Sequence, residues 1–254
     1  MGRMTDEELR AKLISGKPIK FIGIKIVPFT LDEIFDDDVV GLEKYSELLK
    51  ILNVDKASLD GIPDEQLSEI NNFDLFTAQP VLMQKLIEFL TVFLRTDQIG
   101  YSEKYRTLGI QIAPTIGAED IMAYVDRDNF DEFMELFKKI NCVRFEKAEK
   151  AKPANAKALE MMERIKKNAL EEPKPKKQGK FDLTSLISGV CSKHPSLNYT
   201  NVFKLNVFTL WEAYYYLSQS NQFDSTMQGV YTGNLSPKDI NFEDISWIKK
   251  INTF

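Results

Sequence analysis

Cysteine and histidine, the residues that most often hold transition metals or act as nucleophile and base, are scarce in this 254-residue chain. There are two cysteines, Cys142 and Cys191, and one histidine, His194. A disulfide framework needs more cysteines, and a zinc site needs closely spaced Cys or His residues. We therefore expect free thiols, no metal site and no cofactor.

A catalytic role for His194 is the functional alternative, with the imidazole as general base for Cys191 three residues earlier. Such a pair needs a shaped pocket and a third group that orients the base, and nothing in the sequence indicates either. Pro195 after the histidine is typical of a loop. Glycine-rich phosphate loops and GxSxG nucleophile elbows are also absent from the sequence. The sequence predicts no catalytic residue, so we expect neither an enzyme nor a small-molecule substrate.

Long hydrophobic runs are missing too. No stretch of about 18 apolar residues is present, so the sequence predicts no transmembrane helix. Charged residues such as Glu7, Glu8 and Arg10 lie where a signal peptide would need an apolar region. We therefore expect a cytoplasmic protein that has no membrane partner.

The net charge of −5 is not typical of a nucleic-acid-binding protein, but the charge is unevenly distributed. Residues 144–180 hold 12 Lys and Arg against 6 Asp and Glu, so they carry +6 and the rest of the chain carries −11. A weak nucleic-acid arm is one interpretation of this stretch. However, residues 146–180 offer no aromatic side chain on which a base could stack. They contain three prolines and many lysines, which favours a linker.

The linker divides the chain into an N-terminal domain at 1–145, the basic linker at 146–180 and a C-terminal module at 181–254. The N-terminal part has two capping boxes, Thr5–Glu8 and Thr30–Glu33, each of which predicts a helix start. Between them, residues 18–28 are rich in β-formers and predict a small hairpin or extended element. We expect a mostly α fold with this one extended element.

The remaining N-terminal patterns predict more helices. Residues 81–95 are apolar on nearly every face, which is typical of a buried central helix. Residues 109–112 alternate like a strand, and two short helices are expected at about 118–125 and 128–140. The acidic run 36–38 is interpreted as a solvated helix end, with a calcium site as the alternative, because calcium loops need alternating ligands and a glycine turn.

The C-terminal module is dense in aromatic residues. Asn206 is a good N-cap for a helix at about 207–220, and further helices are expected at about 222–232 and 242–251. An aromatic stripe on the first of these helices predicts either core packing or a partner-binding surface, because Trp and Tyr anchor many interfaces. The candidate partner-binding residues are Phe208, Trp211, Tyr214, Tyr215 and Trp247.

Two segments resemble a known group of proteins. The first comprises residues 16–19, the extended run, residues 28–34 with the pattern Pro-x-Thr-x-x-Glu-Ile, and then Glu43-Lys44-Tyr45. It resembles the start of proteins encoded in the tail-morphogenesis region of phages and prophages of Gram-positive bacteria. The second comprises residues 198–205, Phe208-x-Leu210-Trp211, Tyr214-Tyr215 and Trp247. It resembles the C-terminal part of phage tail assembly chaperones.

The resemblance implies a non-structural assembly factor in the cytoplasm of the host bacterium. Its partner would be the tape measure protein, whose long apolar helices would otherwise aggregate, with the tail tube protein as a second client. Self-association is compatible with this role, and no nucleic-acid partner is expected. A minor structural tail or tail-completion protein is the alternative, and a phage regulatory or anti-defence protein that binds a host factor is a further one.

Overall fold

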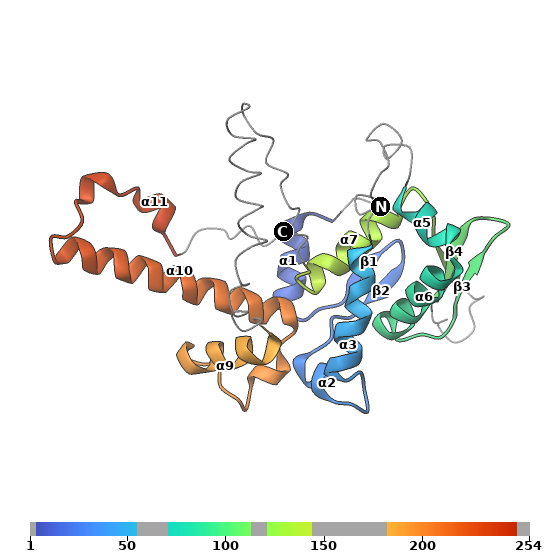
Figure 1. Ribbon diagram of the computed structural model, residues 1–254, viewed down its shortest axis with the longest axis horizontal. Helices are drawn as coiled ribbons and strands as arrows, with labels where there is room; N and C mark the ends of the chain where they lie inside the picture. The colour runs from blue at the N-terminus through green and yellow to red at the C-terminus, as the bar shows by residue number, and fades with distance from the viewer. Residues whose placement is uncertain (1–3, 55–70, 113–120, 144–181, 248–254) are drawn as a thin grey trace, which may run out of the picture.

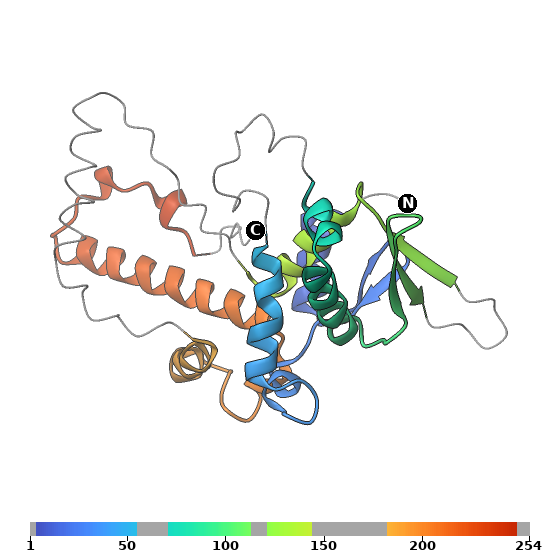
Figure 2. The same ribbon diagram turned by 45° about the vertical axis from the view of Figure 1, so that its right-hand side comes forward.

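The computed structural model describes residues 4–54, 71–112, 121–143 and 182–247 (Figures 1 and 2). The basic linker expected at 146–180 lies outside the described residues. Most of the described elements are helices, and two small antiparallel sheets accompany them. The prediction of a mostly α fold is therefore confirmed.

The chain begins with helix α1 (Asp6–Ile14), which starts at the expected capping box. A hairpin follows, in which β1 (Ile19–Phe21) pairs with β2 (Ile24–Ile26). Its two turn residues, Ile22 and Gly23, have φ angles of +41° and +92°. Positive φ at both central positions is what a two-residue type I′ turn requires. The prediction of a small hairpin is confirmed.

Three short helical elements come next: α2 (Leu31–Phe35), α3 (Leu42–Leu48) and the 3₁₀ helix η1 (Leu49–Asn53). The second capping box is present at the start of α2. The acidic run lies in the turn between α2 and α3, where the carboxylate of Asp36 accepts a hydrogen bond from the N–H of Asp38 (2.9 Å). The run therefore belongs to a turn between two helices.

The core of the N-terminal body is aromatic and is formed by α5 (Asn72–Ala78), α6 (Pro80–Leu94) and α7 (Phe130–Ile140). Phe89 of α6 lies 5.1 Å, centroid to centroid, from Phe137 of α7, and both side chains are fully buried. Phe21 of the hairpin stacks on Phe133 of α7 at 5.3 Å. The helices expected at 81–95 and 128–140 are confirmed, and they hold the hairpin against the core.

A three-stranded antiparallel sheet with the order β3-β4-β5 covers one end of this body. Its strands are β3 (Ile99–Ser102), β4 (Thr107–Ile112) and β5 (Ile121–Val125). The helix expected at 118–125 is wrong, because residues 121–125 pair with β4. Ala123 and Val125 are buried while Met122 and Tyr124 are exposed, which is the alternation of a strand. Apolar residues at 121, 122 and 125 also fit a helical spacing, and the long-range pairing with β4 decides between the two.

The C-terminal part consists of α9 (Leu183–Lys193), the 3₁₀ helix η3 (Val202–Lys204), α10 (Val207–Tyr231), the 3₁₀ helix η4 (Pro237–Asp239) and α11 (Phe242–Ile245). The two helices expected at 207–220 and 222–232 are wrong as separate elements, because α10 continues through both ranges. The polar residues at 218–222 do not interrupt it. The third expected helix, at about 242–251, begins at Phe242 and ends at Ile245, and residues 248–251 of that range lie outside the described residues.

The C-terminal helices are joined to the N-terminal body near the start of α10 (Figure 1). The N–H of Leu31 donates to the carbonyl of Leu205 (2.7 Å), and the side-chain amide of Asn206 donates to the carbonyl of Leu13 (2.7 Å). Val202 and Phe208 are fully buried in the same core as the N-terminal helices. The start of α10 is therefore part of the common core.

A partly buried ion pair adds a second connection between α1 and α10. The guanidinium of Arg10 donates to the carboxylate of Glu212, which is buried, and to the hydroxyl of Tyr216 (2.8 Å). Because a carboxylate in this position has little water to solvate it, it depends on the arginine. The pair therefore fixes the side of α10 that faces α1.

We expect Arg10→Ala to lower the free energy of unfolding by about 3 kcal/mol, because it leaves the Glu212 carboxylate buried without its cation. The matched control is Lys50→Ala, which removes an exposed ion pair with Glu47 and should destabilise the protein much less, because solvent screens a pair on the surface. Urea denaturation of both variants measures the difference. Equal effects for the two variants would contradict this role of Arg10.

Glu33 completes the capping box of α2 beside the junction with the C-terminal helices. Partial burial raises the pKa of Glu33, but hydrogen bonds from Arg95 and from the N–H of Thr30 outweigh it, so the net pKa is lowered from 4.5. A lowered pKa in the folded state contributes stability above the unfolded pKa, and this stability is lost as the pH falls.

We therefore expect Glu33→Gln to destabilise the protein by less than about 1 kcal/mol near neutral pH, because it removes the charge of an ion pair with Arg95 that solvent partly screens. The difference from the wild type should shrink as the pH falls from about 6 to about 3. Chemical denaturation across this pH range measures it, with Glu43→Gln at an exposed position as the control. A difference that stays constant with pH would show that the carboxylate charge is not responsible.

Candidate protein-binding surface

Helix α10 is buried only at its first residues and then leaves the body of the protein (Figures 1 and 2). The buried residues of α10 are Val207, Phe208, Leu210 and Glu212. Among the described residues from 213 to 247, none is buried. Residues 213–231 continue the helix for about 28 Å, at 1.5 Å per residue. We call residues 213–247 the arm.

Three aromatic rings lie together where the arm begins. Trp211 is 5.7 Å from Tyr214 and 6.0 Å from Tyr215, and the two tyrosine rings are 5.9 Å apart, all measured between centroids. All three side chains are partly exposed. Rings at these distances stabilise one another and present a large, rigid apolar surface. We call these three residues the aromatic cluster.

A narrow crevice of about 180 Å³ lies beside the cluster and includes Trp211 in its lining. Apolar residues from α3, α9 and α10 form much of its wall, among them Leu42, Leu186 and Val207. The hydroxyl of Tyr45 also lines it and donates to the side-chain oxygen of Asn141 (2.7 Å). Burial raises the pKa of Tyr45, so the phenol stays protonated and keeps donating. The crevice is therefore largely apolar, with Ser46 and Asp182 as further polar members of its lining.

The five candidate partner-binding residues do not form one surface. Trp211, Tyr214 and Tyr215 form the aromatic cluster, whereas Phe208 is fully buried in the core and supports the fold. Trp247 is exposed and lies beyond α11, in the last part of the arm. The residue types were a sufficient signal for the cluster, but they did not distinguish a core phenylalanine from a surface ring.

The far end of α10 carries apolar residues that the sequence reasoning did not select. Tyr231, the last residue of α10, is 80% exposed. Leu235, which follows α10, and Phe242, the first residue of α11, are exposed as well. The helix ends in a Schellman motif, in which Gly233 has φ +75° and the N–H of Asn234 donates to the carbonyl of Gly229 (2.9 Å). A Cβ atom at Gly229 would lie 2.7 Å from the Cδ1 atom of Leu235, so a larger residue there would require the leucine side chain to shift. The Gly-Asn pair after Tyr231 was a usable signal for this helix end.

Cys191 and His194 are not arranged for nucleophilic catalysis. The Nδ1 atom of His194 accepts hydrogen bonds from the backbone N–H groups of Ser196 (3.2 Å) and Leu197 (3.1 Å), so it shapes the turn after α9. Burial raises the pKa of the Cys191 thiol. A reactive cysteine needs the opposite shift, because the thiolate is the nucleophile. His194 therefore stabilises a turn, and the Cys191 thiol is not activated as a nucleophile.

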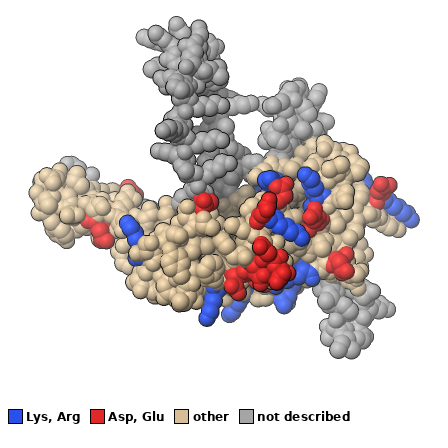
Figure 3. Space-filling model, turned by 60° about the horizontal axis from the view of Figure 1, so that its bottom comes forward, with Lys and Arg blue, Asp and Glu red and all other residues tan. Residues whose placement is uncertain are grey.

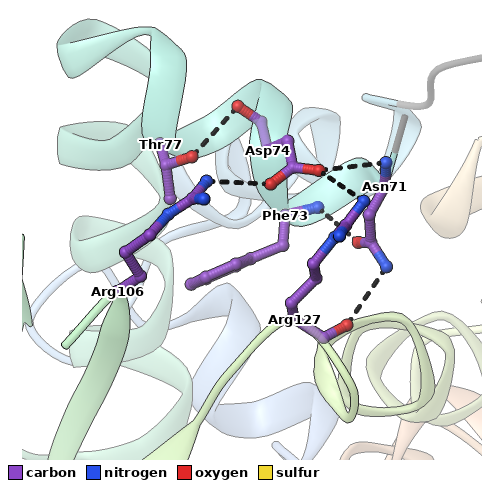
Figure 4. Close-up of polar contacts among 6 residues, drawn as sticks. All are labelled: Asn71, Phe73, Asp74, Thr77, Arg106 and Arg127. Atoms are coloured by element: carbon purple, nitrogen blue, oxygen red, sulfur yellow. Dashed lines mark hydrogen bonds and ion pairs between the residues drawn. The ribbon is translucent and has the colours of Figure 1, made fainter. Parts of the chain in front are cut away.

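A second cavity, of about 590 Å³, lies near the sheet and contains a network of charged residues (Figure 4). The carboxylate of Asp74 binds Arg106 (3.0 Å) through one oxygen and Arg127 (3.2 Å) through the other. It also accepts the N–H of Asn71, which closes the capping box of α5. The Asp74 carboxylate thus connects α5 with the turn between β3 and β4 and with the loop between β5 and α7. The network therefore has a structural explanation.

Within ranges 4–54, 71–112, 121–143 and 182–247, no group of three or more His, Cys, Asp or Glu side chains is placed to hold a metal ion. In the same ranges, none of the helices is long and apolar enough to cross a bilayer.

Comparison with known families gives one match. Residues 174–252 match the family model described as YomV second domain, which belongs to a phage-derived family of the Bacillus phage SPBeta type. The matched range includes α9, α10 and α11, and it covers about a third of the chain. The match supports a phage protein. Searches of curated proteins and of solved structures gave no match.

The Asp74 network yields a testable prediction. We expect Asp74→Asn to lower the free energy of unfolding by about 1–2 kcal/mol, because it removes two ion pairs and weakens the α5 cap. Glu103→Gln, which changes an exposed carboxylate in the lining of the same cavity, should change it by less than about 0.5 kcal/mol. Urea denaturation of the two variants provides the comparison. If Asp74→Asn were as stable as the wild type, the network would not be needed for the fold. Arg106 and Arg127 would then be candidates for anion binding.

Proposed function

We propose that the protein is a phage tail assembly chaperone, which binds the tape measure protein in the cytoplasm of the host bacterium. The observation that carries the proposal is the aromatic cluster at the base of the arm. Its three rings are partly exposed and lie beside an apolar crevice. The match of residues 174–252 to a phage-derived domain supports a phage protein. The assembly role is supported by the resemblance of segments in both halves of the chain to tail-morphogenesis proteins.

The chemistry of the cluster fits an apolar helical client. Trp and Tyr are the residues that dominate binding energy at protein interfaces, because they bury a large area with little loss of side-chain entropy. An amphipathic helix binds by inserting side chains at intervals of three and four residues into a hydrophobic groove. In this proposal one client side chain enters the crevice beside Trp211 while its neighbours pack on Tyr214 and Tyr215.

The proposed role is binding without catalysis. It needs no cofactor, metal or small-molecule substrate, and tail tube subunits would be a second client of the same kind. Each contact with an extended client is weak, and several such contacts along one client add up to stable binding.

A structural part of the tail is the second candidate function, and the arm favours it. A segment of this length in which no described residue is buried is also expected of a protein that is embedded in a larger assembly. Mass spectrometry of purified particles distinguishes the two functions. A structural part is present in fixed copy number, whereas a chaperone is absent.

The proposal is tested by co-expression with the tape measure protein of the same phage. We expect the wild-type chain to keep the tape measure protein soluble and to be recovered with it. Trp211→Ala combined with Tyr215→Ala should reduce that recovery at least about tenfold, because the substitutions remove two interface anchors.

Tyr105→Ala is the matched control, since Tyr105 is an exposed aromatic residue in the turn between β3 and β4. Circular dichroism must show unchanged helix content for the double variant, so that lost binding is not lost folding. The proposal fails if the wild-type chain neither binds nor solubilises the client. If the double variant binds normally, the client does not bind at the aromatic cluster.

A further inference from the structure

The crevice beside Trp211 has room for a single side chain. Its volume is about 180 Å³, whereas pockets that hold small-molecule ligands usually measure about 300–1,000 Å³. Apolar residues from three helices form much of its wall, including Leu42 of α3, Leu186 of α9 and Val207 of α10. The crevice therefore suits the apolar part of one side chain of a partner.

Asp182 is the one charged residue among the described residues that line the crevice. It is exposed, so its carboxylate lies where the crevice opens to solvent. Its Oδ1 atom accepts hydrogen bonds from the hydroxyl of Thr184 (2.6 Å) and from the N–H of Ser185 (2.7 Å). These hydrogen bonds lower the pKa of Asp182, so the carboxylate is charged near neutral pH.

This carboxylate can accept more hydrogen bonds than the fold gives it. A carboxylate has about four acceptor positions on its two oxygens, and the hydrogen bonds from Thr184 and Ser185 both use Oδ1. The N-terminus of α9 would itself favour an anion, but Asp182 already fills that position as the N-cap. The opening of the crevice therefore favours a cation.

The surroundings of the crevice add to this preference. The rings of Trp211 and Tyr215 attract a cation that lies over their faces. Helix α3 lines the crevice, and residues 32–47 hold seven Asp and Glu against one Lys, which is a net charge of −6. Figure 3 shows the charged side chains of the N-terminal body, with a dense acidic group near the centre of the view. A negative surface attracts basic groups and raises their local concentration.

We propose that the side chain of the client that enters the crevice is a lysine or an arginine. Its apolar stem packs against Trp211 and Leu186, and its cationic group pairs with the carboxylate of Asp182. These two residue types bury their stems along apolar surface while the charged end stays near water. An acidic anchor would meet the like charge of Asp182, and an apolar anchor would not use the carboxylate. The inference rests on the proposed function, because it names the residue by which the client is bound at the aromatic cluster.

The experiment uses overlapping peptides that together cover the tape measure protein, and fluorescence anisotropy measures their binding to the full-length protein. Peptides that bind the wild type but not the variant with both Trp211→Ala and Tyr215→Ala occupy the aromatic cluster. In each of them we expect one Lys or Arg whose replacement by Met raises the dissociation constant about tenfold. Methionine is chosen because it keeps an unbranched apolar stem and removes the charge.

Asp182→Asn is the matched variant of the protein, because Asn is as good an N-cap as Asp and α9 keeps its start. It should raise the dissociation constant of the unmodified peptide about three- to fivefold, as expected for an exposed ion pair. It should change that of the Met peptide less than about twofold, because the two interacting groups are then both absent.

Glu43→Gln is the control for general attraction between an acidic protein and a basic peptide. It removes one exposed carboxylate of α3 that does not line the crevice, so it changes the net charge by the same amount. It should raise the dissociation constant of the unmodified peptide less than about twofold, because salt screens exposed charges that are far apart. Circular dichroism checks that both variants keep their helix content.

Two results would overturn the inference and leave the proposed function intact. One is a set of cluster-binding peptides in which every Lys and Arg can be replaced without loss of affinity. The other is an Asp182→Asn variant that distinguishes the unmodified peptide from the Met peptide as strongly as the wild type does. In both cases the client still binds at the aromatic cluster.

Absence of peptide binding is interpreted together with the co-expression experiment. If the tape measure protein is not bound in co-expression either, the inference and the proposed function both fail. If it is bound there, Asp182→Asn is compared with the wild type in co-expression, where unchanged recovery of the client overturns the inference alone.

Discussion

The position of the whole C-terminal part depends on one buried residue, Asn206. Its side-chain oxygen accepts the N–H of Thr209 (2.9 Å), which caps α10, and its amide donates to the carbonyl of Leu13 at the end of α1 (2.7 Å). Its backbone also forms a bridge with Thr30, the capping residue of α2. A single residue therefore sets where α10 begins: its side chain connects that point to α1, and its backbone connects it to the start of α2. Because a buried amide that loses one partner is costly, this arrangement specifies a single orientation at the start of the helix.

From this point outward the protein changes from core to surface within a few residues. Phe208 and Leu210 are fully buried, Trp211 is partly exposed, and the next described residues along the arm are exposed to different degrees. The body keeps its phenylalanines inside and its charges outside, as a protein that stays dissolved must. The arm does not follow the first of these rules, because its Phe242 is exposed. The same 25-residue helix thus belongs to the core at one end and to the candidate interaction surface at the other.

Much of the N-terminal fold could be predicted from the sequence, because its signals are local. The capping boxes at Thr5 and Thr30 each set a helix start, and the apolar segment 81–95 became the buried helix α6. Strand β5 could not be predicted, because its pairing with β4 is a contact between distant residues and its apolar spacing also fits a helix. The candidate residues were found by type, and burial then separated them: Phe208 lies in the core, whereas Trp211, Tyr214 and Tyr215 lie together. The exposed end of the arm was not identified, because exposure depends on packing and cannot be inferred from residue type.

The continuity of α10 has a mechanical consequence. The helix contains no proline, and its one glycine, Gly229, is near the far end, so nothing between base and tip is expected to bend it sharply. It therefore behaves as a stiff lever that pivots at the junction with α1. A sideways force at Tyr231 acts through a lever of about 28 Å, from residue 213 to the tip at 1.5 Å per residue. The resulting torque falls on the Arg10 and Glu212 ion pair and on the Asn206 anchor. Whatever binds the tip can thus change the load on the body without touching it.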